Sequence, residues 1–465
     1  MKTTLVKATS IRGRLADEPF RADLFLWGRG VDVPVGDLLR GTTLGGRLAE
    51  LEGRSVLLLT REPLAAATAL IELDGVAARL VVCPPGLSNA DLKLVIARAG
   101  VDAIVSDCGP SDDLDCRDLL QVICGGPIAP SPAQRFGART TEWILLTSGT
   151  TGSPRMSAHT LPGLAAALDA SQAQTAGLVW GTFYDIRRYG GLQIFLRAVL
   201  GGGSLVVTGA GELQDDFLIR LAAHGATHVS GTPSHWRRAL MSPASRAVPA
   251  RYVRLSGEIA DQAILNALAS QYPDAAICHA FASTEAGVGF EVNDGRAGFP
   301  ASYVGADGDV QIRIENDSLH LRSRRVASHY VGESSALAGA DGFVDTGDLV
   351  ERRGDRYYFL GRRSGVINIG GLKVCPEEVE AAINHHPEVQ GSLVTAKSNP
   401  IVGALVAARV VLRGGVEDGD DRSDVKNEIL AICKARLAAH KVPATIHFVR
   451  ALDMSAAGKL DRHHA

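Results

Sequence analysis

The sequence predicts an α/β protein with a large N-terminal domain of layered α/β subdomains plus a β-rich part, followed by a small α+β C-terminal domain. Two observations lead to this expectation. Short apolar strands alternate with helical stretches before about residue 300, and apolar and polar residues alternate one by one after it. The length of 465 residues is also long for one domain and favours two or three. We expect an N-terminal domain over 1–361 and a C-terminal domain over 362–465.

The layered part begins with the apolar run "SVLLLT" at residues 55–60, which is typical of a buried strand. A helix over 63–75, a strand over 78–85 and a second helix over 88–100 follow. Ser88 can cap that second helix, and Gly100 follows its end. The same alternation continues in "VDAIVSD", "GSLVVTG", "DDFLIRLAAHGATHVSGTP", "YVRLSGE" and "DQAILNALASQYPDAAICHAF".

The β-rich part contains "GDVQIRIENDSLHLRS" and "DRYYFLGR", which read as half-exposed antiparallel strands. The last segment holds a helix at "PEEVEAAINHHP", a strand pair at "GSLVTAKS" and "GALVAARVVL", and an amphipathic helix from Asp424 to His440. One face of this last helix carries Val425, Ile429, Ile432, Cys433 and Leu437.

Composition excludes several classes of function. Lys and Arg number 48 and Asp and Glu 51, so the formal net charge of -3 gives no reason to expect nucleic acid as a partner. No apolar run approaches the roughly 20 residues of a membrane span, and the N-terminus lacks the apolar core of a secretory signal. The 7 cysteines have no Cys-x-x-Cys spacing, which favours free thiols in a reducing cytoplasm over a metal site.

The stretch "TSGTTGSPR", Thr147 to Arg155, follows the apolar run "WILL". Glycines let the backbone N–H groups converge on an anion, while the hydroxyls and Arg155 add donors and positive charge. The stretch therefore has the composition of a phosphate-binding loop, although it lacks the Gly-Lys-Ser/Thr of a P-loop. Taken alone, a loop of Ser, Thr and Gly is more often an ordinary turn.

Four further motifs follow in the chain. "FASTEAG" at 281–287 offers a hydroxyl and a carboxylate at a strand end, and "DTGD" at 345–348 places two carboxylates at a turn. "GRRSGVINIGGLKVCPEEVE" at 361–380 is a glycine-punctuated hairpin that leads into a helix, and "SAAGKLDR" at 455–462 exposes Lys459 near the C-terminus. Each motif by itself fits a surface turn or a solvated tail. Their joint occurrence in this order is much harder to explain by chance.

In these five motifs the chain resembles the adenylate-forming superfamily of acyl-CoA synthetases, carrier-protein adenylation domains and luciferases. The resemblance implies an acid–thiol ligase that forms an acyl-adenylate from ATP with Mg²⁺ and then passes the acyl group to a thiol. It implies Glu285 as the metal ligand, Lys459, Glu285 and Thr284 as catalytic residues, and Gly370 and Gly371 beside the thiol tunnel. The nucleotide would be bound by Thr147, Ser148, Gly149, Thr150, Thr151, Gly152, Arg155, Ser256, Gly257, Glu258, Phe281, Ser283, Asp348 and Arg362. The C-terminal domain would be mobile and would carry Lys459 away from the site after the first step.

The sequence departs from the family pattern at several positions. Arg155 and Met156 replace the usual lysine and glycine, and Ser364 stands at the hinge where Asp or Lys is common. In "FYDIRRYGGLQIFL", charged residues enter a region that lines the acyl site in the family. They either face water at the rim, or an arginine pairs with a polar or anionic group of the acid. The residues expected to line the acyl pocket are Tyr184, Arg187, Tyr189, Gly190, Trp236 and Gly287.

The acceptor of the acyl group stays open between two thiols. Coenzyme A is favoured because the chain contains no carrier domain and no "GGxS" site for phosphopantetheine. A separate acyl or peptidyl carrier protein is the alternative. Because residues of the phosphate loop, the hinge and the C-terminal motif differ from the family pattern, a nucleotide-binding protein without ligase activity is a further alternative. The identity of the carboxylic acid does not follow from the sequence.

Overall fold

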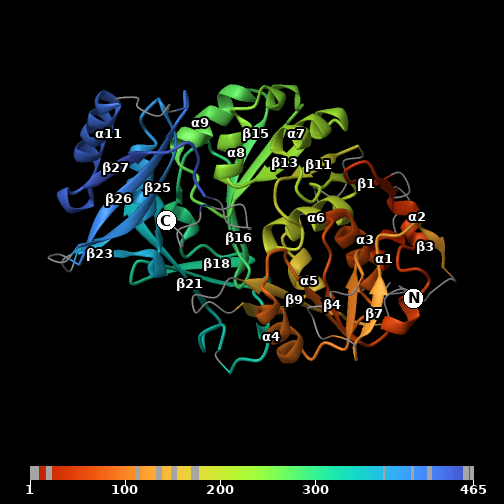
Figure 1. Ribbon diagram of the computed structural model, residues 1–465. Coiled ribbons are helices and arrows are strands. Elements are labelled where there is room, and N and C mark those ends of the chain that lie inside the picture. The colour runs from red at the N-terminus through yellow and green to blue at the C-terminus, as the bar shows by residue number, and fades with distance from the viewer. Residues whose placement is uncertain are drawn as a thin grey trace.

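The structure is a computed structural model that describes residues 10–16, 24–109, 116, 118–131, 139–147, 154–168, 177–334, 336–369, 372–399, 403–415, 422–453 and 460. The chain runs from the N-terminal layers through the central green strands to a separate C-terminal lobe (Figure 1). This arrangement is the predicted mixed α/β architecture, with several sheets in the large N-terminal part and a small C-terminal part.

Two large sheets form the layered part. Within the described ranges, the first contains eight strands in the order β16-β15-β14-β13-β11-β12-β1-β2. Strands β15, β14, β13, β11, β12 and β1 run parallel, as expected for strands joined by helical crossovers. The bounds are β16 Gly287–Val292, β15 Ala276–Ser283, β14 Tyr252–Ser256, β13 His228–Gly231, β11 Val179–Thr182, β12 Ser204–Val206, β1 Phe25–Trp27 and β2 Asp32–Pro34.

The second large sheet contains seven strands, again counted over the described ranges, in the order β20-β10-β9-β5-β4-β6-β7. Its bounds are β20 His329–Tyr330, β10 Arg155–Thr160, β9 Glu142–Thr147, β5 Arg79–Val82, β4 Ser55–Leu58, β6 Ala103–Ser106 and β7 Leu120–Ile123. A short pair joins β3 Gly41–Thr42 to β8 Ala129–Pro130.

Helices cover both faces of the first sheet. On one face α7 (Gln214–Ala223), α8 (Pro233–Ala239) and α9 (Gln262–Gln271) share a buried core with Val229, Val253 and Leu255. On the other face α6 (Tyr189–Gly201) packs in a core that it shares with α3 (Pro63–Leu73) and with strands of both sheets. The remaining helices before residue 300 are α1 Ile11–Ala16, α2 Val35–Arg40, α4 Asn89–Ala99 and α5 Leu161–Ala165.

The predicted ends of α4 are confirmed. The Ser88 side chain accepts a hydrogen bond from the Asp91 N–H, and Gly100 ends the helix with a left-handed φ of 59°. Glycine adopts this conformation without the steric cost that a Cβ would add.

The β-rich part is an antiparallel sheet in the order β17-β22-β21-β19-β18, with bounds Phe299–Pro300, Arg356–Arg362, Val344–Arg353, Ser318–Ser323 and Val310–Glu315. The C-terminal lobe contains β23 Ile367–Ile369, β24 Leu372–Val374, α10 Pro376–Ile383, β25 Val389–Asn399, β26 Gly403–Leu412, α11 Ser423–Arg436 and β27 Thr445–Phe448. Its buried residues from Ile367 to Ile446 form their own core, while the boundary after residue 361 stays a prediction.

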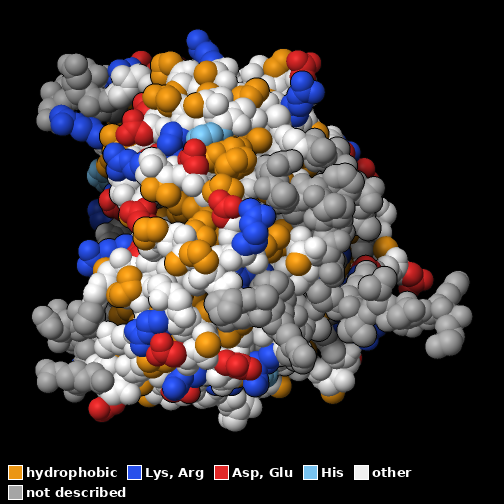
Figure 2. Space-filling view, turned by 90° about the vertical axis from the view of Figure 1, so that its right-hand side faces the viewer, with side chains coloured by type: hydrophobic (Ala, Val, Ile, Leu, Met, Phe, Trp, Pro, Cys, Tyr) orange, Lys and Arg blue, Asp and Glu red, His pale blue; other side chains and the backbone are white. Residues whose placement is uncertain are grey.

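The helix predicted to reach His440 ends at Arg436, because Leu437 is extended at φ -122° and ψ 152°. Acidic and basic side chains are interspersed on the face shown in Figure 2, in keeping with the nearly balanced charge. Among the described residues, no helix has both the length and the apolar character needed to cross a bilayer.

Candidate active site

The candidate site lies where parallel strands of the first sheet end. Strands β11, β13, β14 and β15 lie side by side in this order and run parallel. Their last residues therefore lie along one edge of the sheet, and these are Thr182, Gly231, Ser256 and Ser283. In open α/β sheets, ligands bind in the crevice outside the carboxyl ends of the strands. The "STE" motif begins with Ser283, the last residue of β15, and Thr284 and Glu285 follow it at this edge.

The second sheet meets this edge through Thr147, the last residue of β9. The Thr147 hydroxyl donates to Oε1 of Glu285 at 3.4 Å, across 138 residues of sequence. The Ser283 Oγ accepts a hydrogen bond from the Ala286 N–H at 3.0 Å, and this bond closes the turn that follows β15. The predicted loop residues 148–152 lie outside the described residues, but the strand that leads into them ends beside the "STE" motif.

Arg155 pairs with Thr147 in the β9–β10 ladder, on the strand that follows the loop. Its guanidinium lies 5.2 Å from the centre of the Tyr330 ring, and its Nε is 3.6 Å from Glu333 Oε1. The loop arginine is therefore held by an aromatic face and a carboxylate. Its predicted contact with phosphate stays a prediction.

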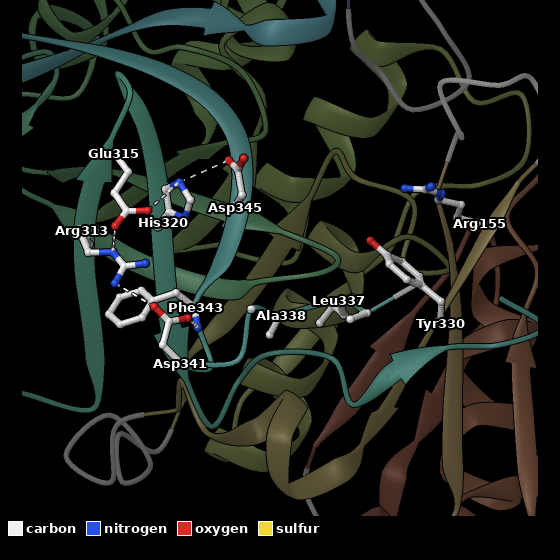
Figure 3. Close-up of a pocket in the computed structure, with 12 residues that line it drawn as sticks. Arg155, Arg313, Glu315, His320, Tyr330, Leu337, Ala338, Asp341, Phe343 and Asp345 are labelled. Carbon is white, nitrogen blue, oxygen red and sulfur yellow. Dashed lines mark hydrogen bonds and ion pairs between the residues drawn. The ribbon is translucent and has the colours of Figure 1, made fainter. Parts of the chain in front are cut away.

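Arg155 and Tyr330 line one side of a cavity of about 570 Å³ that extends toward the β-rich sheet (Figure 3). Asp345 lies on the opposite side, where it accepts hydrogen bonds from Ser318 at 2.6 Å and from the Gly347 N–H at 2.9 Å. Burial opposes ionisation of Asp345, but these bonds and the nearby Arg363 guanidinium hold its pKa below the ordinary value. The cavity wall on this side is therefore anionic.

Asp348 and Arg362, which were both expected to bind the ribose, lie side by side. They are register partners in the β21–β22 pair, and Arg362 Nε is 3.3 Å from Asp348 Oδ1. Burial lowers the pKa of Arg362, but the charges of Asp348, Glu285 and Glu377 outweigh it and raise the pKa. The "TGD" aspartate, the following arginine and the "STE" glutamate thus share one electrostatic environment.

Phe281, the aromatic residue expected to pack on adenine, lies in a stack of phenylalanine rings. The Phe281 ring lies 5.4 Å from that of Phe359 at an angle of 9° and 5.7 Å from that of Phe290. The turn Ser256–Glu258 lies one strand away, at the end of β14, and Gly257 takes a φ of 84° there.

Glu258 connects this turn to the C-terminal loop. Its Oε2 accepts the Ser234 N–H at 2.9 Å in the first turn of α8, and its Oε1 accepts the Leu460 N–H at 3.2 Å. Leu460 is the residue after Lys459. A second contact between the lobes joins Asn384 Nδ2 to Asp261 Oδ2 at 3.5 Å. Lys459, Gly370 and Gly371 themselves lie outside the described residues.

Three of the predicted acyl-pocket residues come together at the start of α6. A Cβ on Gly190 would lie 3.7 Å from the Tyr184 ring, and the Tyr184 hydroxyl donates to the Ser256 carbonyl at 2.7 Å. Tyr189 is buried, and burial raises its pKa, so it stays a neutral phenol. Gly287 lies at the start of β16 with a φ of 76°.

Two acyl-pocket predictions are corrected. Arg187 is 3% exposed and is bonded to Asp185 at 2.6 Å and to the Thr60 carbonyl, so it fixes the loop before α6 and neither faces water nor is available to an acid. Trp236 packs with Phe183 in the core on the α7–α9 face, because α8 lies on the side of the sheet away from Ser256.

Several polar side chains near this site were not predicted from the sequence. His159 and Ser157 lie buried on β10, and the His159 ring centre is 5.9 Å from that of Tyr189. Glu258 and Asp261 were not expected to bond the C-terminal lobe. Polar residues inside an otherwise apolar strand, as in "RMSAHT", are the signal that could have found the β10 pair.

Comparison with known proteins shows the family to which the chain belongs. The family model "AMP-binding enzyme" matches residues 30–327, and "AMP-binding enzyme C-terminal domain" matches residues 378–459. The chain belongs to the AMP-binding enzyme family, and it is an adenylate-forming enzyme of that superfamily.

Individual relatives are distant. The chain is 25% identical to a 2-succinylbenzoate–CoA ligase of Listeria innocua over 81% of this chain and 79% of the relative, and 25% identical to that of Bacillus cereus over 88% and 87%. Among solved structures, an anthranilate–CoA ligase bound to anthranoyl-AMP superposes with a TM-score of 0.81 at 18% identity, covering 98% of this chain and 96% of the other. An amide bond synthetase of Marinactinospora thermotolerans reaches 0.76 at 20% identity, covering 97% of each chain.

Proposed function

We propose that the protein is an acid–thiol ligase that activates a carboxylic acid as its acyl-adenylate and passes the acyl group to coenzyme A. The observation that carries this proposal is the Leu460–Glu258 hydrogen bond, which brings the end of the C-terminal lobe to the strand-end site. The relatives named as CoA ligases support the choice of acceptor.

ATP would lie along the edge formed by β14, β15 and β9. Thr147 to Gly152 and Arg155 would bind the β- and γ-phosphates, and Ser283 and Thr284 the α-phosphate region. Phe281 and Ser256 to Glu258 would flank the adenine, while Asp348 would accept hydrogen bonds from the ribose hydroxyls with Arg362 beside it. Asp348 suits this role because it is an acceptor held next to a cation.

Glu285 and Thr147 fit a magnesium ion by the chemistry of their donors. They present a carboxylate and a hydroxyl oxygen 3.4 Å apart, and Mg²⁺ commonly takes one carboxylate together with substrate phosphates. The ion would supply positive charge to the phosphates. The described residues contain no cluster of three His, Cys, Asp or Glu, so the protein would contribute few ligands.

Lys459 would bridge the reacting carboxylate and the α-phosphate in the first step. A lysine is suitable because two anions must approach each other there, and its charge is placed where negative charge develops. The Leu460 contact with Glu258 would hold this loop for adenylation. Movement of the C-terminal lobe would then remove Lys459 and bring Gly370 and Gly371 toward the thiol.

Two half-reactions test the proposal. Acid-dependent ATP–pyrophosphate exchange reports the first step, and thioester formation from a synthetic acyl-adenylate reports the second. We expect exchange with part of a broad acid panel and thioester on CoA. We also expect Lys459→Ala to lose exchange by about 10²-fold or more while thioester transfer changes little.

The acceptor is decided by supplying CoA, a holo carrier protein and an amine in parallel. Product on the carrier protein alone would replace CoA as the acceptor, and product on the amine alone would place the chain beside the amide bond synthetases. ATP binding without exchange for any acid would reject the ligase and favour a binding protein.

A further inference from the structure

Tyr330 lies on β20, a short strand at the edge of the second sheet beside the candidate site. The Val331 N–H donates to the Met156 carbonyl at 2.8 Å, which attaches β20 to the strand that follows the predicted phosphate loop. The Ala327 N–H donates to the Glu285 carbonyl at 2.9 Å, which attaches the start of the same segment to the "STE" motif. Backbone bonds therefore fix Tyr330 between the two motifs proposed to bind phosphate and metal.

The register of β20 with β10 brings the Tyr330 ring to Arg155. Tyr330 is the register partner of Ser157, so these two side chains leave the same face of the sheet. Arg155 precedes Ser157 by two residues and shares this face, whereas Met156 and Ala158 belong to the core on the opposite face. Diagonal neighbours of this kind are within reach of each other when one side chain is aromatic and the other is long. The Arg155 guanidinium carbon accordingly lies 5.2 Å from the centre of the ring.

This contact suits an arginine better than a lysine. A guanidinium is planar and weakly hydrated and stacks on aromatic faces, whereas an ammonium is a compact and strongly hydrated charge. Attraction between the cation and the ring uses none of the N–H donors of the guanidinium, so these donors stay available to phosphate oxygens. The arginine that replaces the usual lysine of the family pattern therefore has an aromatic partner in this fold.

The Tyr330 hydroxyl provides a further donor next to this cation. Burial and the charge of Glu285 raise the pKa of the phenol, and Arg155 lowers it by less, so the phenol stays protonated at neutral pH. Both side chains point into the cavity of about 570 Å³, toward the side where His320 and Asp345 lie (Figure 3). The phosphate oxygens of ATP accept hydrogen bonds and carry negative charge, so a cation beside a hydroxyl donor is complementary to them.

We propose that Tyr330 is a further residue of the nucleotide site, where its ring holds the Arg155 guanidinium and its hydroxyl donates to the pyrophosphate end of ATP. This inference rests on the proposed function, which places the β- and γ-phosphates beside Arg155. A ligand without these two phosphates, such as AMP, does not reach Tyr330. Thioester formation is also independent of Tyr330, because no pyrophosphate is bound during that step.

Equilibrium titration with ATP and with AMP, each in the presence of Mg²⁺, tests the role of the hydroxyl and requires no acid substrate. Tyr330→Phe keeps the ring and removes the hydroxyl. We expect this variant to raise the Kd of ATP by about tenfold, because a hydrogen bond to a charged group is lost, and to leave the Kd of AMP unchanged. An unchanged Kd for ATP, or an equal rise for ATP and AMP, would overturn the inference.

A pair of double variants tests the role of the ring. Tyr330→Phe and Tyr330→Leu both lack the hydroxyl, and only the first retains an aromatic face. We expect Arg155→Lys to raise the Kd of ATP more in the Tyr330→Phe background than in the Tyr330→Leu background, because only the first still favours a guanidinium over an ammonium. An equal rise in the two backgrounds would refute the contribution of the ring.

Tyr358 provides the matched control. It is a tyrosine of β22 whose ring centre lies 5.4 Å from the Arg353 guanidinium, and it lies outside the lining of the cavity. Tyr358→Phe and Tyr358→Leu remove the same groups from a second arginine–tyrosine contact of the chain. Both variants are expected to leave the Kd values of ATP and AMP unchanged. If they weaken ATP binding as much as the Tyr330 variants do, the effect is a general structural one and the inference fails.

The two half-reactions separate this inference from the ligase proposal. Tyr330→Phe is expected to raise KM for pyrophosphate by about tenfold in the exchange reaction and to leave thioester formation from a synthetic acyl-adenylate unchanged. A matching loss of thioester formation would contradict the assignment of Tyr330 to the pyrophosphate end of the site. Failure of the wild-type protein to support exchange with every acid would instead refute the ligase proposal, and the comparison of ATP with AMP would still decide the role of Tyr330.

Discussion

Glu258 offers a direct way to separate the two half-reactions by one substitution. Its two carboxylate oxygens have different partners: Oε2 accepts from Ser234 N–H in α8, and Oε1 accepts from Leu460 N–H beside Lys459. Glu258→Gln keeps one acceptor oxygen for the helix, but the amide nitrogen it introduces cannot accept from Leu460. The substitution therefore removes the Leu460 contact and retains both the Ser234 bond and the second contact between the lobes, Asn384 with Asp261.

The size of the effect follows from the nature of this bond. Hydrogen bonds to charged groups contribute about 1.5–3 kcal/mol, and the lower end applies because Glu258 is only half-buried. About 1.4 kcal/mol corresponds to a tenfold change in rate or occupancy. We expect Glu258→Gln to reduce ATP–pyrophosphate exchange by about tenfold and to change thioester formation from synthetic acyl-adenylate by less than about twofold.

Two controls sharpen this experiment. Leu460→Ala retains the backbone N–H and should behave as wild type. Thr232→Ala removes the side chain that caps α8 through His235 N–H at 3.0 Å and retains the Glu258 carboxylate that accepts from Leu460. If Thr232→Ala reproduces the selective loss of exchange, or if Glu258→Gln slows both half-reactions equally, the assignment of Glu258 as a docking residue is refuted.

Three further predictions concern single residues. Arg155→Lys should raise KM for ATP about two- to fivefold, because the ammonium of lysine is a point charge and lacks the planar set of donors of a guanidinium. Glu333→Gln should lower KM for ATP, because it removes the carboxylate that pairs with Arg155. Unchanged KM values in both variants would show that these two side chains do not affect ATP binding. Gly287→Ala should lower the free energy of unfolding in urea by about 2–3 kcal/mol, because Gly287 has a φ of 76° and a Cβ there would lie 2.5 Å from the Arg325 carbonyl oxygen. Gly305→Ala is the control: Gly305 has a φ of 75° but no atom near the position of a Cβ, so the free energy of unfolding should fall by only about 1 kcal/mol. Burial lowers the pKa of His159 to about 4 from 6.5, so the unfolded chain binds the proton more readily than the folded chain. The contribution of His159 to stability is complete above about pH 6.5 and is lost, by about 3 kcal/mol, as the pH drops to about 4. His159→Leu should reduce the slope of stability against pH by this amount, while buried His235, whose pKa is lowered to about 3, should keep part of the slope.

The sequence alone predicted the features that depend on local chain geometry. The ends of α4 follow from the hydroxyl of Ser88 and the left-handed φ of Gly100, which are properties of a few neighbouring residues. The resemblance assigned Asp348 and Arg362 to the ribose, and the structure makes them register partners in one antiparallel strand pair.

Which side of the sheet a residue faces required the tertiary structure. Trp236 and Ser230 are six residues apart, yet one lies in the core on the α7–α9 face and the other beneath α6, because a strand alternates its faces and the next helix crosses to one side. Arg187 and Arg188 are adjacent, and only the fold shows that Arg187 is bonded to Asp185 and Thr60.

The sequence by itself therefore determined the family, the order of the motifs and the chemistry they can perform. The tertiary structure decided which groups meet. It brings Glu285 to Thr147, Leu460 to Glu258 and Arg197 to Arg254, pairs that lie from 57 to 202 residues apart along the chain. Contacts of this kind depend on the packing of whole sheets and helices, and no local pattern of residues encodes them.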